Sequence, residues 1–144
     1  MGRISIGKEI SSLARQVRML RNRCLKEAGC AVSAAHFHVF VYIARNEGCT
    51  EKQVAQAIGS DKTLVAKAVK KLTHQGLAFC RRDDEDARFK RVWPTPQGIA
   101  EMEKVGRALR RITDILSQGI DEAQTKQFLQ TLEKMQQNVS ESLE

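Results

Sequence analysis

The side chains best suited to catalysis are few in this 144-residue chain, and their spacing does not match an active site. The acids of segment 83–86 stand beside arginines in a predicted turn, where we expect a solvated, salt-bridged tip. His36 and His38 are two residues apart, so on a helix they point to different faces and make a poor pair of metal ligands. The sequence lacks a glycine-rich phosphate loop, an HExxH motif and a GxSxG motif. We therefore expect no enzyme activity, no cofactor and no bound metal.

The cysteines offer redox sensing as an alternative chemistry. They are Cys24, Cys30, Cys49 and Cys80, and because none forms a CxxC pair we expect reduced thiols. A reactive thiol needs a lowered pKa and access to solvent. Arginines lie near Cys24 and directly after Cys80, so these two cysteines are the candidate redox residues. Cys24 also falls in an apolar helix seam, where a buried and inert thiol is the ordinary outcome.

Nucleic-acid binding is indicated by the basic segment after Ser60. Apolar residues recur there at helical spacing on one face, namely Val65, Ala68, Val69 and Leu72. The opposite face carries Thr63, Ala66, Lys67 and Lys70, with Lys62, Lys71 and His74 close by. We expect Ser60 to cap this helix at its N-terminus and Gly76 to end it.

The polar face of this helix has the residue types that read a major groove. Lys67 could donate to guanine, Thr63 to a base edge or a phosphate, and Ala66 could touch a thymine methyl group. Lys70, Lys71 and His74 lie further along the helix, where contacts to phosphate are expected. Lys62, at the start of the helix, is a further candidate for DNA binding.

Two short strands are predicted after the basic helix, over residues 77–82 and 89–93, with a charged tip between them. Arg82, Lys90 and Arg91 add positive charge to this hairpin. Thr50 and Gln53 form a capping box that opens a helix ending at Gly59, just before the basic helix. A helix, a short turn, a basic helix and a basic hairpin are typical of a winged helix-turn-helix.

One ordered set of residues in this region consists of Lys62-Thr63, Val65, Lys67, Val69, Leu72, Gly76-Leu77, Asp86-x-Arg88, Val92 and Thr95-x-x-Gly98. This pattern resembles the MarR family of bacterial and archaeal transcription regulators. The resemblance implies that Arg88 contacts DNA in or beside the minor groove. It also implies that Asp86 holds the wing by pairing with a neighbouring arginine, and Arg82 is the expected partner.

Long amphipathic helices flank this region. The first, predicted over residues 3–28, has apolar residues at the alternating spacing of a helix–helix seam, namely Ile6, Ile10, Leu13, Val17, Leu20 and Cys24. Ser33 is expected to cap a second helix, apolar on most faces and buried at the centre of the domain. After the wing, Thr95 and Asp121 are predicted to cap two more helices, and the last has a stripe of Phe128, Leu132, Met135, Val139 and Leu143.

The apolar stripes of the terminal helices exceed what one small core can cover, so we expect a second copy to cover them. The resemblance implies a homodimer in which the N- and C-terminal helices intertwine. The expected interface residues are Ile6, Ile10, Leu13, Val17, Leu132, Met135 and Val139. We thus predict a mainly α fold with a small β-hairpin wing. Its single domain spans residues 1–144, with a DNA-binding lobe over 33–95 and dimerisation helices over 3–28 and 96–143.

Charge supports an anionic partner on one side of the chain. The net charge is +7, and residues 1–28 contribute seven lysines and arginines against two acids, whereas residues 94–144 contribute six against eight. Such asymmetry suits binding to double-stranded DNA through one surface. No apolar run approaches the roughly 20 residues of a membrane span, and a signal peptide is not evident, so we expect a cytoplasmic protein without membrane contact.

The resemblance implies a sequence-specific DNA-binding regulator. The usual family member is a repressor that binds an inverted-repeat operator as a homodimer and is released by a small aromatic or phenolic acid. Candidate residues for lining such an effector site are Arg15, Arg18, His38 and Tyr42. Three alternatives remain open: a thiol-based redox-sensing regulator, a winged-helix protein-interaction module, and a protein that coats DNA without sequence preference.

Overall fold

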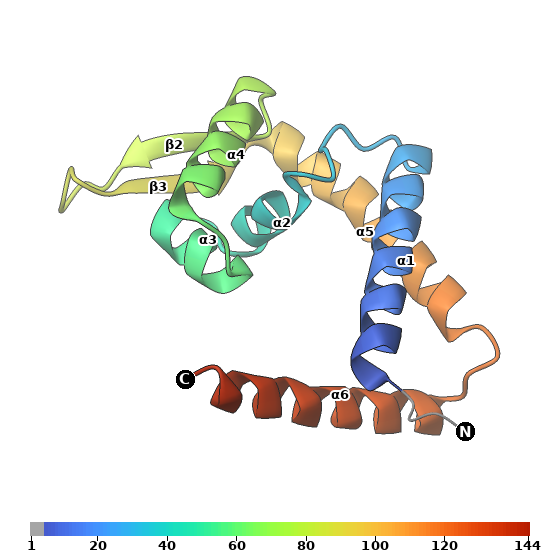
Figure 1. Ribbon diagram of the computed structural model, residues 1–144. Coiled ribbons are helices and arrows are strands. Elements are labelled where there is room, and N and C mark those ends of the chain that lie inside the picture. Colours follow the sequence, from blue (N-terminus) through green and yellow to red (C-terminus); the bar gives the residue numbers. More distant parts are fainter. Residues whose placement is uncertain (1–4) are drawn as a thin grey trace.

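The computed structural model describes residues 5–144 as a mainly helical chain with one small antiparallel sheet (Figure 1). Its elements are α1 (Ile6–Glu27), α2 (Phe37–Arg45), β1 (Cys49–Thr50), α3 (Glu51–Ile58), α4 (Lys62–His74), β2 (Ala78–Arg82), β3 (Lys90–Pro94), α5 (Pro96–Ser117) and α6 (Glu122–Ser142). The expected fold class is confirmed. The first helix was expected to begin at residue 3, and residues 3 and 4 lie outside the described residues.

Helix α2 lies at the centre of the lobe that contains the helix-turn-helix and the wing. Its side chains at Phe37, Val39, Phe40 and Ile43 are buried, and it packs against α3, α4, β3 and α5. Because apolar residues cover most of the circumference of α2, only a central position removes them all from water. The expected burial of this helix is confirmed.

Several predicted helix ends are confirmed. Thr50 and Gln53 form a capping box at the start of α3, which ends at Gly59 in the left-handed conformation. Thr95 caps α5, with Pro96 in its first turn. Asp121 caps α6 and forms a second capping box with Gln124.

Two predicted caps were wrong. Asp61, not Ser60, caps α4, and its carboxylate accepts a hydrogen bond of 2.6 Å from the Thr63 amide. The Ser60 amide donates to the Ala55 carbonyl, so Ser60 belongs to the end of α3 instead.

Ser33 likewise does not cap α2. Its carbonyl closes a turn by accepting from the His36 amide, and the helix begins only at Phe37, without a side-chain cap. The chain before this turn is fixed by the buried Glu101 of α5, whose carboxylate accepts hydrogen bonds from the Ala31 and Val32 amides at 2.6 and 2.7 Å.

The wing has three strands where the sequence predicted two. The order is β1-β3-β2, and the short strand β1 pairs with β3 through Cys49 opposite Val92 and Thr50 opposite Arg91. A strand of two residues has no alternating pattern, so the sequence gives no indication of it. The pairing ties the turn between α2 and α3 to the root of the wing.

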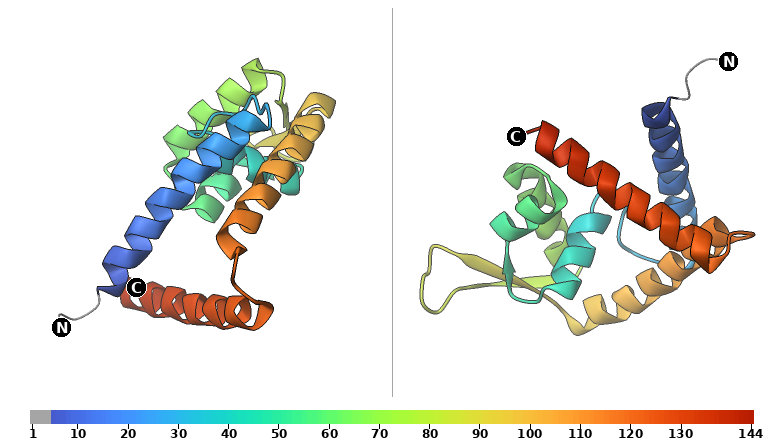
Figure 2. Two further views of the ribbon diagram at one scale, coloured as in Figure 1. Left: turned by 90° about the vertical axis from the view of Figure 1, so that its right-hand side faces the viewer. Right: turned by 90° about the horizontal axis from the view of Figure 1, so that it is seen from below.

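Outside the lobe, α1 packs against α5, and α6 forms a separate arm that runs beneath the rest of the molecule (Figures 1 and 2). Cys24, the last position of the predicted helix–helix seam, is buried in the core of the chain, as expected for an inert thiol. Ile6, Ile10 and Leu13, nearer the start of α1, are exposed. Helix α6 has no buried residues.

Candidate nucleic-acid interface

Helix α4 separates an apolar face from a basic one. Val65, Ala68, Val69 and Leu72 are buried in the lobe. The residues on the outward side are Lys62, Thr63, Lys67, Lys70, Lys71 and His74, all exposed, and the half-buried Ala66. Within residues 5–144, both recorded ion pairs lie in the wing, so no acid neutralises the α4 lysines there. The helix therefore presents uncompensated positive charge beside short side chains, which suits insertion into a groove of DNA.

Leu64 is a residue on this helix that the sequence reasoning missed. It lies in the first turn of α4 and is 60% exposed, beside the lysine-rich face. First-turn residues of a recognition helix contact base edges, and an apolar side chain can touch a thymine methyl group. The sequence did contain a sign that Leu64 is exposed. The buried positions of α4 follow the helical spacing of Val65, Ala68, Val69 and Leu72, and Leu64 falls outside that spacing.

Strand register divides the basic residues of the wing between two faces. Arg82 lies directly opposite Lys90, and Arg81 lies directly opposite Arg91. Alternation along β3 places Lys90 on the same side as the buried Val92 and places Arg91 on the other side. Like charges directly opposite each other are unfavourable. The Arg82–Lys90 pair has no acid partner among the described ion pairs, so it is suited to holding an anion such as a phosphate.

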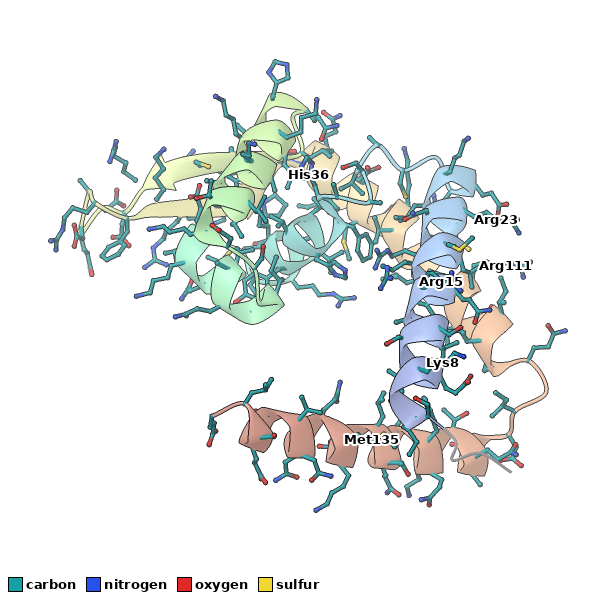
Figure 3. All side chains as sticks on the ribbon, viewed as in Figure 1. Lys8, Arg15, Arg23, His36, Arg111 and Met135 are labelled. Carbon is teal, nitrogen blue, oxygen red and sulfur yellow. The ribbon has the colours of Figure 1, made fainter. Side chains whose placement is uncertain are left out.

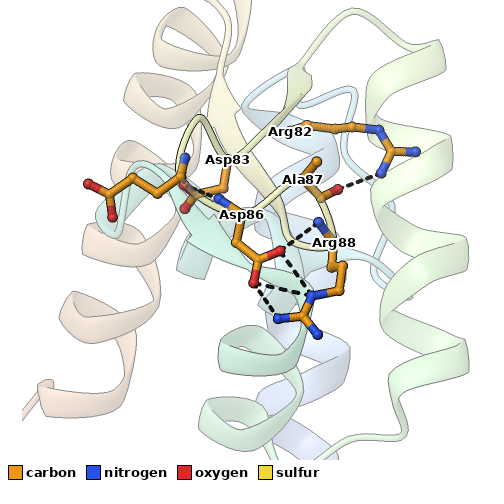
Figure 4. A network of polar contacts seen from close by, with 6 residues as sticks. Arg82, Asp83, Asp86, Ala87 and Arg88 are labelled. Carbon is orange, nitrogen blue, oxygen red and sulfur yellow. Dashed lines mark hydrogen bonds and ion pairs between the residues drawn. The ribbon is translucent and has the colours of Figure 1, made fainter.

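At the wing tip, Asp86 pairs with Arg88 (Figure 4). The Arg88 guanidinium donates to both carboxylate oxygens of Asp86, at 2.8 Å from Nη2 and 3.0 Å from Nε, yet the Arg88 side chain remains 87% exposed. These side-chain hydrogen bonds, followed by the one from the Arg88 amide, lower the pKa of Asp86, and the pKa of Arg88 is raised by the same pairing. The tip thus holds an exposed arginine in one orientation.

The expected pairing of Asp86 with Arg82 was wrong. Arg82 instead donates from Nη1 to the Ala87 carbonyl at 2.7 Å (Figure 4). The turn before Arg88 brings its guanidinium back onto Asp86, because the Asp86 carboxylate also accepts from the Arg88 amide. That local ring of hydrogen bonds leaves Arg82 to support the backbone of the tip.

Arg91 is already occupied within the protein. Its Nε lies 2.6 Å from Asp83 Oδ2, and its Nη1 donates to the Gly48 carbonyl at 2.9 Å. The hydrogen bond from Arg91 is the largest cause of a lowered pKa for Asp83, and the amide of Glu85 adds to it. Of the four basic wing residues named from the sequence, Arg91 is thus the one held by both a carboxylate and a carbonyl.

Comparison with known proteins agrees with this geometry. A sequence model described as MarR family matches residues 32–88. The HTH-type transcriptional regulator BilQ of Clostridium symbiosum is 26% identical over 111 residues, which are 77% of this chain and 76% of that protein. The solved structure of the transcriptional regulator SlyA is 26% identical, with a TM-score of 0.83 over 96% of each chain. Over residues 32–88 the chain matches the MarR family, and the relatives named here are similar to it over most of its length.

A structural neighbour extends the likeness of this chain to a protein solved as a DNA complex. A MarR-family regulator from Listeria monocytogenes, solved with a 26mer DNA, has a TM-score of 0.84, covering 97% of this chain and 92% of that one at 21% identity. At that identity the likeness concerns the fold alone. The matched family model and the 26% identical relatives are those of transcriptional regulators, and the fold they share with this chain is a winged helix-turn-helix.

The residues expected to line an effector site come from two helices. Arg15 and Arg18 are exposed on α1, where Figure 3 labels Arg15 between Lys8 and Arg23. His38 and the half-buried Tyr42 lie on α2. The structure adds Arg21, which the sequence reasoning had not included: its Nη1 lies 3.2 Å from His38 Nε2, and its guanidinium lies 4.9 Å from the centre of the Phe37 ring.

A separate groove of about 570 Å³ lies between the end of α2 and the outer face of α5. Its lining residues are Ala44, Glu47, Ile99, Met102, Glu103, Gly106, Arg107 and Arg110. None of the four expected effector residues lines this groove. The sequence reasoning had no means of finding it, because no single helix contains its walls.

The candidate redox cysteines are not well exposed. Cys24, on α1, is buried in the core, and Cys80, on β2, is half-buried beside Val92. Burial raises the pKa of Cys49, and burial followed by the Glu101 charge raises the pKa of Cys30. Cys49 and Cys80 flank Val92 on opposite sides of β3, about 10 Å apart across two strand spacings, which is too far for a disulfide.

Other site types have no counterpart in the part of the chain that the structure describes. Residues 5–144 contain no cluster of three or more histidine, cysteine or acidic side chains that could hold a metal ion. Within the same residues, every helix is too short or too polar to cross a membrane.

Proposed function

We propose that this protein is a MarR-family regulator that binds an inverted-repeat DNA operator as a homodimer and represses transcription until a small ligand releases it. The observation that carries the proposal is the pairing of the uncompensated basic face of α4 with a wing that presents an exposed, oriented Arg88. A major-groove helix and a minor-groove arginine together give sequence selectivity and affinity. A regulator of this kind acts on chromosomal DNA, so we propose the cytoplasm as its location.

Specific residues divide between the two roles. We assign base contacts to Lys67, Thr63 and Ala66, and phosphate contacts to Lys62, Lys70, Lys71, Arg82 and Lys90. The Listeria neighbour, solved with DNA, supports the same use of the shared fold here. Arg91 is excluded from this assignment because its donors are already engaged by Asp83 and Gly48.

The homodimer is supported by apolar surface that the single chain leaves exposed. Ile6, Ile10 and Leu13 of α1 and Val139 of α6 are exposed although they are spaced for helix packing. Met135 lies midway along the α6 arm, which packs little against its own chain (Figure 3). A second copy would cover these side chains. Twofold symmetry would then place two recognition helices roughly 34 Å apart, which corresponds to one turn of DNA and an inverted repeat.

An aromatic or phenolic acid is the proposed effector, and the junction of α1 and α2 is its proposed site. Arg21 Nε is buried without a hydrogen-bond partner among the described residues, and burial, followed by the charge of the nearby Arg18, lowers the pKa of Arg21. A carboxylate is the group that two neighbouring arginines would bind, and Phe37 supplies an apolar wall. Binding there would alter the packing of α1 against the DNA-binding lobe.

Titration of labelled DNA, with and without an inverted repeat, at several salt concentrations tests the DNA-binding function. With six to ten phosphate contacts per dimer, affinity should fall by roughly 10³–10⁵ between 50 and 200 mM salt. Preference for the repeat supports an operator-specific regulator, whereas equal affinity for all DNA supports the coating protein. An affinity that is weak and independent of salt supports the protein-interaction module.

Adding benzoate to the same titration tests the effector. Wild-type protein should release the operator, and Arg21→Ala should remain bound. Release that is equal in both proteins would contradict the proposed site at the α1–α2 junction.

A further inference from the structure

Arg91 joins two parts of the DNA-binding lobe that are far apart in sequence. Its Nε pairs with Asp83 at the wing tip, and its Nη1 donates to the carbonyl of Gly48, a residue 43 positions earlier in the turn between α2 and β1. The planar guanidinium suits this task because its donors have a fixed geometry and can hold two acceptors at once. The side chain therefore reaches from β3 to the residue just before β1 and to the residue just after β2.

The Gly48 end of this bridge is firmly placed. The Gly48 amide donates to the Val92 carbonyl at 2.9 Å, so the backbone at Gly48 is hydrogen-bonded to β3 independently of Arg91. Gly48 has a φ of +81°, and a Cβ atom there would lie 3.3 Å from Trp93 Nε1, so the indole ring packs directly on the glycine. The turn is thus a rigid anchor for the wing.

The Asp83 end of the bridge organises the tip. One carboxylate oxygen of Asp83 accepts from Arg91, and the other accepts from the Glu85 amide at 2.8 Å and, more weakly, from the Asp86 amide at 3.4 Å. Asp86 in turn holds Arg88. A continuous chain of contacts therefore runs from Gly48 through Arg91 and Asp83 to Asp86, the residue that pairs with Arg88.

Register also places Arg91 on the other face of the hairpin from Arg82 and Lys90, the two wing residues assigned to phosphate. Arg82 and Lys90 share the face of the hairpin that carries Val92 into the core, whereas Arg91 shares the opposite face with Arg81. Two basic residues adjacent in sequence, Lys90 and Arg91, thus have different surroundings. Only Arg91 has a carboxylate partner.

We propose that Arg91 is a positioning residue: by bridging Asp83 and the Gly48 carbonyl, it fixes the angle at which the wing presents Arg88 to DNA, and it does not bind phosphate itself. The proposal rests on the proposed DNA-binding function. It also explains how Asp83 favours DNA binding although its negative charge lies close to the DNA phosphates: the Asp83 carboxylate holds Arg91 in place.

The decisive variant is Asp83→Asn, because the two possible roles of Arg91 predict opposite signs. If Arg91 positions the wing, the loss of the Asp83 carboxylate weakens operator binding by about tenfold, the scale of one charge-assisted hydrogen bond. If Arg91 instead binds phosphate, Asp83→Asn removes a negative charge near DNA and frees Arg91, so affinity should rise. The substitution keeps the side-chain size, which limits other effects on folding.

Salt dependence supplies a second readout. Arg91→Gln should weaken binding about as much as Asp83→Asn, the double variant should be no weaker than either single variant, and the dependence of log affinity on log salt should keep its wild-type slope. Loss of a phosphate contact would reduce that slope by about one per protomer. Arg91→Lys separates the roles again, since lysine restores charge for a phosphate but lacks the fork that holds two acceptors.

Two controls complete the experiment. Arg88→Ala removes the exposed wing arginine and should reduce the salt slope, which shows that the assay detects a lost contact. Arg81→Gln removes one positive charge opposite Arg91 on the same face and should bind nearly as wild type. Emission of Trp93, the single tryptophan, should shift in free Asp83→Asn and Arg91→Gln, since its ring packs on Gly48.

Outcomes for the proposal and for the DNA-binding function are distinct. Failure of the wild-type protein to bind DNA in a salt-dependent way overturns the function. Salt-dependent wild-type binding, with Asp83→Asn as tight as wild type or with Arg91→Lys fully rescued, overturns the positioning role. Thermal midpoints of all variants near the wild-type value show that a loss of affinity does not come from unfolding.

Discussion

At the scale of single residues, adjacent lysines on α4 differ in what they can reach. Lys67 lies in the middle of the outward face, one turn beyond Thr63, whereas Lys71 lies nearer the end of the helix and its flank. The ammonium of Lys67 can therefore approach a base edge, whereas the ammonium of Lys71 can reach only the phosphate backbone of the DNA.

Lys67→Ala should cost on the order of 1–3 kcal/mol on the cognate operator and relax selectivity at one base pair per half-site. Lys71→Ala is the matched control, since it should weaken all sequences equally. The measurement is a binding series against single-base variants of the operator. A uniform loss for Lys67→Ala would assign it to phosphate and would contradict the base contact.

His38 gives the protein a pH dependence with a defined sign. An arginine only donates, so His38 Nε2 accepts from Arg21 and the ring is neutral in this arrangement. Burial, followed by the charge of Arg21, lowers the pKa of His38 below its ordinary value of 6.5. As pH falls below 6.5, the unfolded chain takes up the proton before the folded one, so stability is lost toward lower pH.

We therefore expect the thermal midpoint to drop between pH 7.5 and pH 5.5 in the wild type and to drop less in His38→Gln, whose amide oxygen still accepts from Arg21. His74→Gln is the control, because His74 is an exposed residue at the end of α4 and should leave the profile unchanged. Identical profiles for the wild type and His38→Gln would contradict the neutral state of His38 that accepts from Arg21.

At the scale of elements, the junction of wing and α5 depends on a close backbone approach. Thr95 donates through its amide to the Leu77 carbonyl, and its side chain caps α5 by accepting from the Gly98 amide. A Cβ atom at Gly98 would overlap the Leu77 carbonyl oxygen. The Thr-x-x-Gly pattern thus has a physical cause, which is the contact between the first turn of α5 and Leu77, the residue just before β2.

Gly98→Ala should destabilise the fold by about 1–3 kcal/mol, the usual cost of forcing extra volume into a packed site, because the obstructing atom belongs to the backbone. Gly106→Ala, in the same helix, meets only the Arg110 guanidinium at 3.5 Å and should stabilise by about 0.5–1 kcal/mol. Chemical denaturation of both variants checks the difference. Equal stabilities would remove the steric explanation for the motif.

At the scale of the whole molecule, the chain consists of a packed lobe and terminal helices with apolar residues left in solvent. Leu13 of α1 is 43% exposed and Val139 of α6 is 57% exposed. Charge is also divided, since residues 1–28 are basic and residues 94–144 acidic. If the terminal helices of two copies packed together, the exposed apolar residues would be covered and the basic first helix would lie against acidic C-terminal helices.

Leu13→Glu and Val139→Glu should each convert the proposed dimer to monomer, because an unpaired charge in an apolar interface is costly. Met19→Glu is the control: Met19 is 66% exposed but lies on the other side of α1 from the seam, so the dimer should persist. Light scattering measures the mass. Dimers that survive both seam substitutions would mean that other surfaces form the interface.

The sequence by itself determined the local features of this protein. The helices, the faces of α4, three of the caps and the two strands of the hairpin all follow from residues within one or two turns of each other. Helical spacing and capping preferences act over that range. The residues that resemble the MarR family lie in one continuous segment, so the helix-turn-helix and its basic face could be recognised from the sequence alone.

Tertiary structure alone decided the contacts between distant segments. The strand β1, the Arg91 bridge to Gly48, the Arg21–His38 pair and the hold of Glu101 on Ala31 each join residues 17 to 70 positions apart. Long-range contacts depend on how elements pack, and side-chain type alone does not identify the partner. For that reason the sequence placed Arg91 with the DNA-binding residues, whereas packing directs its guanidinium to Asp83 and Gly48.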